Sequence, residues 1–411
     1  MRNPLTVALD QISPPRLGRD FRWLLSSALI NNLGDGLLLA AGPLLVASQT
    51  HDPFLVSLAL TFDYLPWLLF GLIGGVAADR FNRRLMVIGA NVVRALVLAL
   101  MVVTIANGTV NIVLVLAAIF VLGTAEVFAD SASSTLMPTI VARDDLAVGN
   151  ARLQGAYITV NQLVGPPIGA FMFAIGMALP FAANAAAFVL GAVLIARISS
   201  SVGAVARAGD QPHFVTDLIE GVRWLAAHPA MRTLAITIFT FNVTWGAAMG
   251  VLVLYAAQQL HMDAVGFGLL TTSAAAGGVV ATISYGALTR RFSLGNIMRV
   301  GLLIETLTHL TLALTTSPLI ALGIQFVSGI HGFTWGTTAN TVRQRAVPNE
   351  LLGRVGGVMR FAGYGGLVIG TPIGGLIAGQ FGITGPFWFG FIGSAILVVL
   401  LWRQFGHIAH D

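Results

Sequence analysis

The sequence predicts an all-α membrane protein with twelve transmembrane helices in two pseudo-symmetric six-helix bundles and both termini in the cytoplasm. Three observations support this prediction: a low content of charged residues, the placement of the arginines and an internal repeat. Of the 411 residues, 56% are hydrophobic and only 9% are charged. A soluble globular protein carries about 25% charged residues, so a deficit along the whole chain indicates an integral membrane protein.

The composition also excludes several classes of protein. The chain contains no cysteine and no lysine, so all 22 of its basic residues are arginines. A conventional ATP-driven motor is excluded, because it needs the lysine that grips a nucleotide phosphate in a P-loop. The sequence shows no constellation of nucleophiles or metal ligands and no large extramembrane domain. We therefore expect neither an enzyme nor a receptor, and no metal or cofactor.

The apolar segments follow one another along the chain. Residues 1–21 are polar, and the apolar run after them is too long for a cleaved signal peptide, so it is a retained first span. A helix needs roughly 20 mostly apolar residues to cross a bilayer. By that measure the first bundle, 22–198, contains six spans, near 22–47, 55–78, 84–106, 111–138, 150–175 and 179–197.

A polar break separates the two bundles. The break covers 199–211 and is followed by an amphipathic stretch at 213–230. We interpret 199–230 as a cytoplasmic linker with a helix that lies on the membrane surface. The second bundle, 231–403, holds the spans near 231–258, 265–289, 296–314, 318–341, 355–379 and 385–403, and residues 404–411 form a cytoplasmic tail.

The arginines are confined to alternate loops. Arg80, Arg83 and Arg84 lie between the second and third spans, and other arginines precede the first span, occupy the linker and follow the even-numbered spans. The positive-inside rule therefore places both termini in the cytoplasm. This distribution also explains the pI near 10.4 without a nucleic-acid partner. Arg94, inside the third span, is the exception.

The two halves of the chain repeat each other. Residues 75–81 (GVAADRF) align with 286–292 (GALTRRF), and 165–169 (GPPIG) align with 370–374 (GTPIG). Two six-helix repeats are typical of secondary transporters, in which the substrate binds near the membrane midplane between the repeats.

These motifs resemble those of the major facilitator superfamily, and the resemblance covers essentially the whole chain. Residues 75–84 resemble the family's loop motif G-x-x-x-D-R-x-x-R-R, and Gly165, Pro166 and Gly169 resemble the fifth-span motif of drug/proton antiporters. The first half is most similar to the branch with enterobactin-exporter-like and macrolide-efflux-like proteins. The second half departs from the motif, because Arg290 stands in the place of Asp79. The resemblance implies a monomer in the cytoplasmic membrane of a bacterium.

The resemblance also implies a gate at the cytoplasmic side. We expect the glycines to let spans two and eleven approach closely, and Asp79 to face the N-terminal end of the eleventh span. Arg83 would pair with an aspartate below the fourth span only when that side is closed. The expected gating residues are Gly75, Asp79, Arg80, Arg83, Arg84, Asp144 and Asp145. In the alternative interpretation, the arginines serve only as topology anchors.

Ionisable residues inside the spans are costly and indicate function. Asp35 shares a helix face with Asn31 and Asn32 and is the leading candidate for the proton-carrying carboxylate. Glu126 and Asp130, four residues apart on the fourth span, are the further candidates for proton coupling. The alternatives are a helix–helix hydrogen bond or salt bridge at Asp35, a buried Arg94–Glu126 pair that only joins two helices, and a place for Asp130 in the closing network.

Three ionisable residues of the second half favour structural roles. Glu305 and His309 are four apart on the ninth span, and we favour a structural pair over proton coupling. For His331 on the tenth span we favour a hydrogen-bonded structural histidine over pH sensing.

Two further sets of residues are candidates. By resemblance, the first, fourth, seventh and tenth spans line the cavity, and the candidate substrate residues are Asn31, Asn32, Asp63, Arg94, Asn242, Trp245, Gln325, Trp335 and Tyr364. Each taken singly also suits packing. The candidate hinge comprises Gly165, Pro166, Pro167, Gly169, Gly370, Pro372 and Gly374. A shared bend with close packing explains it at least as well as an antiport device.

The expected function is secondary active export of a small amphipathic molecule by proton antiport and alternating access. The proton gradient is the expected energy source, and the partners are the substrate, protons and the lipid bilayer. A drug-like or natural product is the first substrate class and a siderophore the second. The alternatives are a proton-coupled importer of a small metabolite and a lysophospholipid flippase of the same fold.

Overall fold

The computed structural model describes residues 14–199 and 214–405, and every regular element in these ranges is a helix. Most of the predicted N-terminal segment, residues 200–213 of the predicted linker and residues 406–411 of the predicted tail lie outside the described residues. The described part of the amphipathic stretch forms helix α9, Phe214–Ala227. Its position on a membrane surface stays a prediction.

The chain divides into two compact units. The first consists of Met1–Leu45 and Leu69–Gln211, and the second of Val46–Leu68 and Pro212–Asp411. The sequence analysis assigned Val46–Leu68 to the first bundle, whereas its contacts group it with the second unit. The reason is local: within the second unit this segment packs on the eleventh span, as described below.

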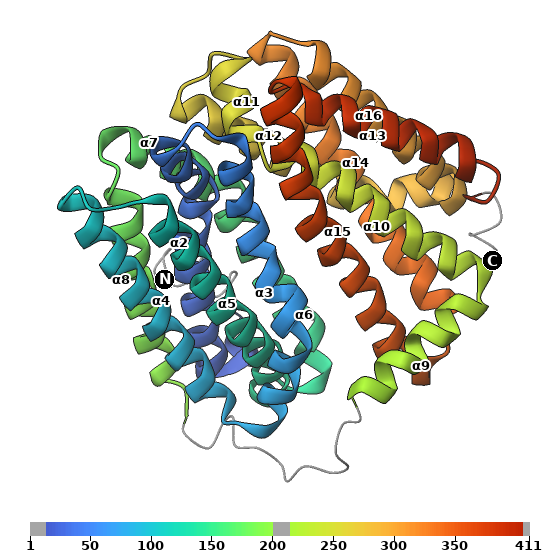
Figure 1. Cartoon of the computed structure of the whole chain (residues 1–411). Helices are drawn as coiled ribbons and strands as arrows, with labels where there is room; N and C mark the ends of the chain where they lie inside the picture. The colour runs from blue at the N-terminus through green and yellow to red at the C-terminus, as the bar shows by residue number, and fades with distance from the viewer. Residues whose placement is uncertain (1–13, 200–213, 406–411) are drawn as a thin grey trace, which may run out of the picture. The chain divides into compact units, whose positions relative to one another are not determined.

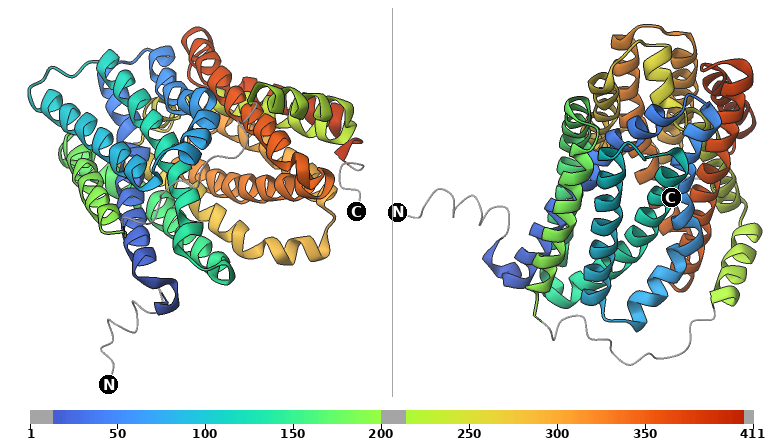
Figure 2. Two further views of the ribbon diagram at one scale, coloured as in Figure 1. Left: turned by 90° about the horizontal axis from the view of Figure 1, so that it is seen from below. Right: turned by 60° about the vertical axis from the view of Figure 1, so that its left-hand side comes forward.

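The first half of the chain contains the elements from η1 to α8 (Figure 1). They are η1 (Pro15–Leu17), α2 (Gly18–Gln49), α3 (Pro53–Arg80), α4 (Arg83–Ala106), α5 (Ile112–Ile140), η2 (Arg143–Asp145), α6 (Leu146–Ala156), the π-helical η3 (Tyr157–Val164), α7 (Gly165–Ile175) and α8 (Leu179–Ala196). Helix α4 lies against α5 and α8, and both views of Figure 2 show α8 beside it.

The second half contains the elements from α9 to α16. They are α9 (Phe214–Ala227), α10 (Pro229–Met249), α11 (Leu252–Gln258), α12 (Ala264–Arg291), α13 (Leu294–Leu314), α14 (Pro318–Ala346), η4 (Asn349–Leu351), α15 (Leu352–Phe381) and α16 (Gly385–Leu401). Helix α13 packs against α14 and α16, and α10 packs against α15.

The helices have the lengths and compositions of membrane spans. Eleven stretches in the described residues are long and apolar enough to cross a bilayer, and α16 is a shorter apolar helix of 17 residues at the place of the twelfth predicted span. Large apolar side chains such as Ile283, Leu319 and Val399 are about four-fifths exposed, as expected for surfaces that face lipid. The predicted all-helical fold is confirmed, while the orientation of the termini stays a prediction.

Two predicted spans are interrupted. The span predicted at 231–258 is divided into α10 and α11 at Gly250 and Val251. The span predicted at 150–175 runs through α6, η3 and α7, and its prolines, Pro166 and Pro167, begin α7 directly after the π-helical turns. Because proline has no N–H to donate, the first turn of a helix tolerates it.

The glycine motif that the two halves share is a packing device. A side chain on Gly165 would meet Gly36 of α2, and one on Gly169 would lie 2.1 Å from the carbonyl oxygen of Leu37. In the second unit, side chains on Gly370 and Gly374 would collide with the backbone of α10 in the same way. Glycine lets these backbones touch. The repeat therefore joins α7 to α2 and α15 to α10, and its role as a hinge stays a prediction.

Candidate functional site

A buried arginine lies between two carboxylates in the first unit. Arg94 of α4 donates through Nη2 to Oδ1 of Asp35 on α2 at 2.9 Å, and the same nitrogen lies 3.4 Å from Oε2 of Glu126 on α5. The guanidinium stands over the ring of Phe188 of α8, 4.1 Å from its centroid. Four helices of the first unit thus meet at one cation, and we call Asp35, Arg94 and Glu126 the Arg94 cluster.

The charges of the Arg94 cluster do not balance. Two ionised carboxylates against one guanidinium leave a net charge of −1, and Asp130 lies one helical turn beyond Glu126 on α5. Net charge inside a bilayer is costly, so a proton or a cationic ligand would stabilise the cluster. The side chains of Asp35 and Glu126 are 25% and 36% exposed and that of Arg94 is 5% exposed. The carboxylates are therefore accessible, whereas their partner is sealed in.

The amides beside Asp35 make helix contacts. Asn31 donates through Nδ2 to Oδ1 of Asn91 at 3.3 Å, and its own Oδ1 occupies space that Gly191 of α8 leaves open. Asn32 donates to the carbonyl of Ala28 on its own helix at 2.7 Å. Their place in a substrate cavity stays a prediction. Asn91 was missed by the sequence analysis, although a mid-span asparagine three residues before Arg94 is a signal that could have revealed it.

The loop between α3 and α4 is held by local caps. The side chain of Asn82 accepts a hydrogen bond from the N–H of Leu85 at the start of α4. Arg83 donates through Nε to the carbonyl of Ala78 at 3.0 Å, near the end of α3. Arg84 donates to the carbonyls of Ile195 and Ala196 at the end of α8. Two of the three arginines thus satisfy carbonyls at helix C-termini.

The residues expected at the gate have the following surroundings within the first unit. Gly75 has open space where a side chain would stand, and its neighbour Gly74 faces Val127 and Ser131 of α5. Asp145 pairs with Arg16, Nε to Oδ1 at 3.2 Å. Within 14–199 and 214–405 neither Arg83 nor Asp79 takes part in an ion pair, and Asp79, Arg80 and Asp144 are exposed. The gating role stays a prediction, since it was expected only of a closed cytoplasmic side.

The N-terminal half of α3 packs closely on α15 within the second unit. The hydroxyls of Thr61 and Thr371 are 2.6 Å apart and hydrogen-bonded, and Gly375 leaves room for Ser57. Trp67 stacks on Tyr364 with centroids 5.6 Å apart.

The other predicted cavity residues of the second unit lie in varied surroundings. Asn242 donates to the carbonyl of Ile238 on its own helix at 2.7 Å. Trp245 is half-buried, and Gln325 and Trp335 are buried. Trp335 stacks on Phe241, with centroids 5.5 Å apart and an interplanar angle of 7°. Asp63 is exposed. These positions do not test a substrate role, which stays a prediction.

Known proteins match this chain along most of its length. A family model described as transmembrane secretion effector matches residues 12–405. The multidrug efflux pump Tap of Mycolicibacterium fortuitum is 27% identical over 377 residues, which cover 89% of this chain and 90% of that protein. The enterobactin exporter EntS of Shigella boydii serotype 4 is 25% identical over 413 residues, covering 93% of this chain and 92% of that protein.

Solved structures show the same fold. The nucleoside transporter NupG aligns with a TM-score of 0.74 at 12% identity, over 95% of this chain and 99% of that one. A bacterial homologue of the iron transporter ferroportin aligns with a TM-score of 0.74 at 17% identity, over 96% of this chain and 99% of that one. At such low identity the likeness concerns the fold alone.

Proposed function

The chain belongs to the transmembrane secretion effector family of the major facilitator superfamily, and on that premise we propose that it exports a small amphipathic molecule by proton antiport. Membership makes it a multi-pass transporter of a small molecule in the bacterial cytoplasmic membrane rather than an enzyme. The direction of transport is carried over from the names of the efflux pump and the exporter that match most of its length.

The Arg94 cluster is the observation that supports proton coupling. A proton on Asp35 or Glu126 removes one of the two carboxylates that Arg94 holds, and the remaining carboxylate still balances the guanidinium. A proton and a cationic group on the substrate compete for the same negative charge. Binding one therefore favours release of the other, which is the thermodynamic requirement for antiport.

Asp35 is the carboxylate we expect to carry the proton. Its side chain is one-quarter exposed, so a proton can reach it, and protonation would release its ion pair with Arg94. Alternating access by the two bundles would expose this group to each side of the membrane in turn, and the proton gradient would supply the energy. We expect the protein to act as a monomer without a cofactor.

Accumulation of a fluorescent lipophilic cation in pump-deficient cells tests the proposal. Cells with the wild-type chain should accumulate less dye than cells with an empty vector, and a protonophore or Asp35→Asn should restore accumulation to the empty-vector level. Asp52→Asn is the matched control, because Asp52 is exposed and an asparagine can still accept the N–H of Phe54. An Asp35→Asn chain that exports the dye as the wild type does would refute the role of Asp35.

A siderophore is the second substrate class. The match to the enterobactin exporter over 93% of this chain favours it. Cells that carry the chain should then secrete more siderophore under iron limitation, measured in the culture supernatant, without any change in dye accumulation. Transport in inside-out and right-side-out vesicles separates either form of export from import of a metabolite.

A further inference from the structure

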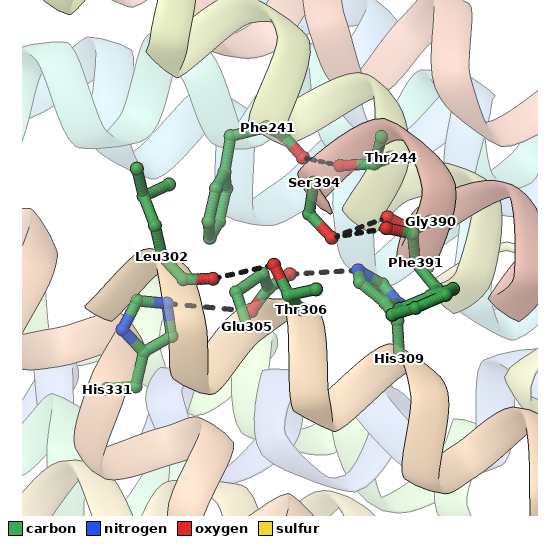
Figure 3. A network of polar contacts seen from close by, with 10 residues as sticks. All are labelled: Phe241, Thr244, Leu302, Glu305, Thr306, His309, His331, Gly390, Phe391 and Ser394. Atoms are coloured by element: carbon green, nitrogen blue, oxygen red, sulfur yellow. Dashed lines mark hydrogen bonds and ion pairs between the residues drawn. The ribbon is translucent and has the colours of Figure 1, made fainter. Parts of the chain in front are cut away.

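The second unit contains a buried cluster of ionisable side chains that the proposed mechanism does not use. Glu305 and His309 lie on α13 and His331 on α14. Oε1 of Glu305 is 3.0 Å from Nε2 of His309, and Oε2 is 3.5 Å from Nε2 of His331 (Figure 3). One carboxylate thus stands between two imidazoles, and we call these three residues the Glu305 cluster. The sequence spacing indicated the pair on α13, and the fold adds His331.

The Glu305 cluster is sealed from solvent. The side chains of all three residues are at most 2% exposed. Two glycines make room for the rings: a side chain on Gly390 of α16 would lie 2.7 Å from Nδ1 of His309, and one on Gly301 would lie 2.9 Å from Nδ1 of His331. The imidazoles therefore occupy close-fitting spaces beside the carboxylate.

The hydrogen bonds of the cluster are incomplete. Oε1 of Glu305, both ring nitrogens of His309 and Nε2 of His331 have no well-aligned hydrogen-bond partner among the described residues, although two of these contacts are short. A structural network in a membrane bundle is expected to satisfy its buried polar atoms. Buried polar atoms without a partner call for an explanation, and a proton held among the three side chains would supply one.

The neighbouring helices contribute no further charge. Phe241 of α10 packs 5.8 Å from the ring of His331. The hydroxyls of Thr244, Thr306 and Ser394 donate to backbone carbonyls, as Figure 3 shows, so they are not committed to the carboxylate. Among the described residues, the titratable groups that act on Glu305 are the two histidines alone.

We propose that Glu305, His309 and His331 form a second proton-binding site, separate from the Arg94 cluster and confined to the second unit. With a bare carboxylate and two neutral imidazoles the cluster has a charge of −1, and one bound proton makes it neutral. A second proton would give +1, and either net charge is costly inside a bilayer. The cluster therefore binds one proton that belongs to the three groups together.

The site binds protons alone. Its groups are too deeply buried to meet a substrate, in contrast to the partly exposed carboxylates of the Arg94 cluster. Release of the proton requires water to reach α13 and α14, so the charge of the cluster reports the conformation of the second unit. The use of this proton in transport rests on the proposed antiport, whereas its binding does not.

Infrared difference spectra of the purified full-length protein, recorded during a pH titration, test the binding of the proton. The wild type should show a titrating band from the carboxylate and the imidazoles, which share the proton, and Glu305→Gln should remove it with a loss of about one titrating proton per chain. His309→Gln and His331→Gln should each shift the pH at which the band changes. The control is Tyr255→Phe, which removes a buried hydrogen bond to the carbonyl of Leu312 on the same helix without touching the cluster.

Two results decide the proposal. A Glu305→Gln spectrum that superimposes on the wild type at every pH overturns it. If Glu305→Gln and Tyr255→Phe lower the melting temperature alike and neither changes the titration, the network is purely structural. This result overturns the proposal as well. Loss of the band in Glu305→Gln, with the band intact in Tyr255→Phe, supports it.

Transport in proteoliposomes tests the use of the proton. With a fluorescent lipophilic cation and an imposed pH gradient, Glu305→Gln should export the dye while moving fewer protons per dye molecule than the wild type does. An unchanged ratio would overturn a coupled role. A wild-type chain that exports nothing would count against the proposed function, and the infrared titration would still decide whether the site exists.

Discussion

The two charge clusters occupy equivalent places in the two repeats, but their central residues, Arg94 and Glu305, have opposite charges. Asn82 caps α4 and Ser293 caps α13, and the central residue of each cluster lies twelve residues after its cap, from 82 to 94 and from 293 to 305. In the first unit a cation sits between two carboxylates, and in the second a carboxylate sits between two imidazoles. The third and fourth spans of each half contribute to both clusters, and in the first half the first span, α2, adds Asp35.

The two repeats share their helix packing but not their charged side chains. The glycine contacts of α7 on α2 and of α15 on α10 occur in both halves. The charged residues of the two clusters differ between the halves. Their accessibility differs as well, because the carboxylates of the Arg94 cluster are partly exposed and the Glu305 cluster is sealed from solvent. The shared packing builds two similar scaffolds, and the buried side chains give them different chemistry.

Removal of the central cation should have the largest effect. Arg94→Leu leaves Asp35 and Glu126 without their counter-ion. Removing one partner of a fully buried ion pair costs about 3–5 kcal/mol of stability, and because both carboxylates are partly exposed we expect the lower end of that range, about 3 kcal/mol. His309→Leu in the second unit should cost less, about 1–3 kcal/mol, because a proton can neutralise Glu305. Thermal unfolding in detergent at alkaline pH measures both. Equal losses of stability would contradict the proposed difference between the two clusters.

A pair of double-mutant cycles sharpens the same contrast. For Asp35→Asn with Arg94→Gln we expect a coupling energy of about 1.5–3 kcal/mol, as for hydrogen bonds to charged groups. For Glu305→Gln with His309→Gln we expect less than about 1 kcal/mol, because the hydrogen bond between them is poorly aligned. Denaturant unfolding of the single and double variants yields both energies. A larger coupling in the second cluster would show a well-formed ion pair there.

The sequence predicted the fold more fully than the sites, for a physical reason. Span length and loop charge are properties of local sequence, so the helices could be counted and ordered without knowing how they rotate. The partners of Arg94 depend on which faces of α2, α4 and α5 meet. Glu126 was named as a possible partner of Arg94, whereas for Asp35, which lies closer, a salt bridge was an alternative without a named partner. The rotation of packed helices is set by tertiary contacts that hydropathy does not encode.

The same limit applies to the second unit and to the repeated glycines. The spacing of Glu305 and His309 places them on one face of a helix, but His331 joins them only because α14 packs on α13. The GPPIG and GTPIG motifs suggested a bend, and the structure adds the partner that each glycine touches. In both cases the sequence revealed the residues and the fold revealed what they contact.

Substitution of the shared glycines should affect the two units alike. A side chain on Gly169 would lie 2.1 Å from the carbonyl oxygen of Leu37, and one on Gly374 would lie 2.0 Å from that of Ala247. Overpacking typically costs about 1–3 kcal/mol, so Gly169→Val and Gly374→Val should lower the melting temperature by similar amounts. Gly155→Ala and Gly379→Ala are the controls, since both sites have open space. A loss in only one unit would contradict the shared packing.

The smallest effect is expected at a contact that both repeats make with different residues. Arg84 of α4 donates to the last carbonyls of α8, and Arg299 of α13 donates through Nε to the carbonyl of Trp402 at the end of α16 at 2.7 Å. A cation at a helix C-terminus contributes about 0.3–1 kcal/mol. Arg84→Gln and Arg299→Gln should therefore lower stability slightly and equally, measured by thermal unfolding in detergent. The two arginines stand at different distances from the starts of their helices. Equal effects would therefore show that the repeats share an arginine contact with a helix C-terminus, although the arginine comes from a different position in each. A loss of dye export in Arg84→Gln at unchanged stability would instead assign that arginine to the gate, and the two repeats would then differ at their surface as well as at their buried charges.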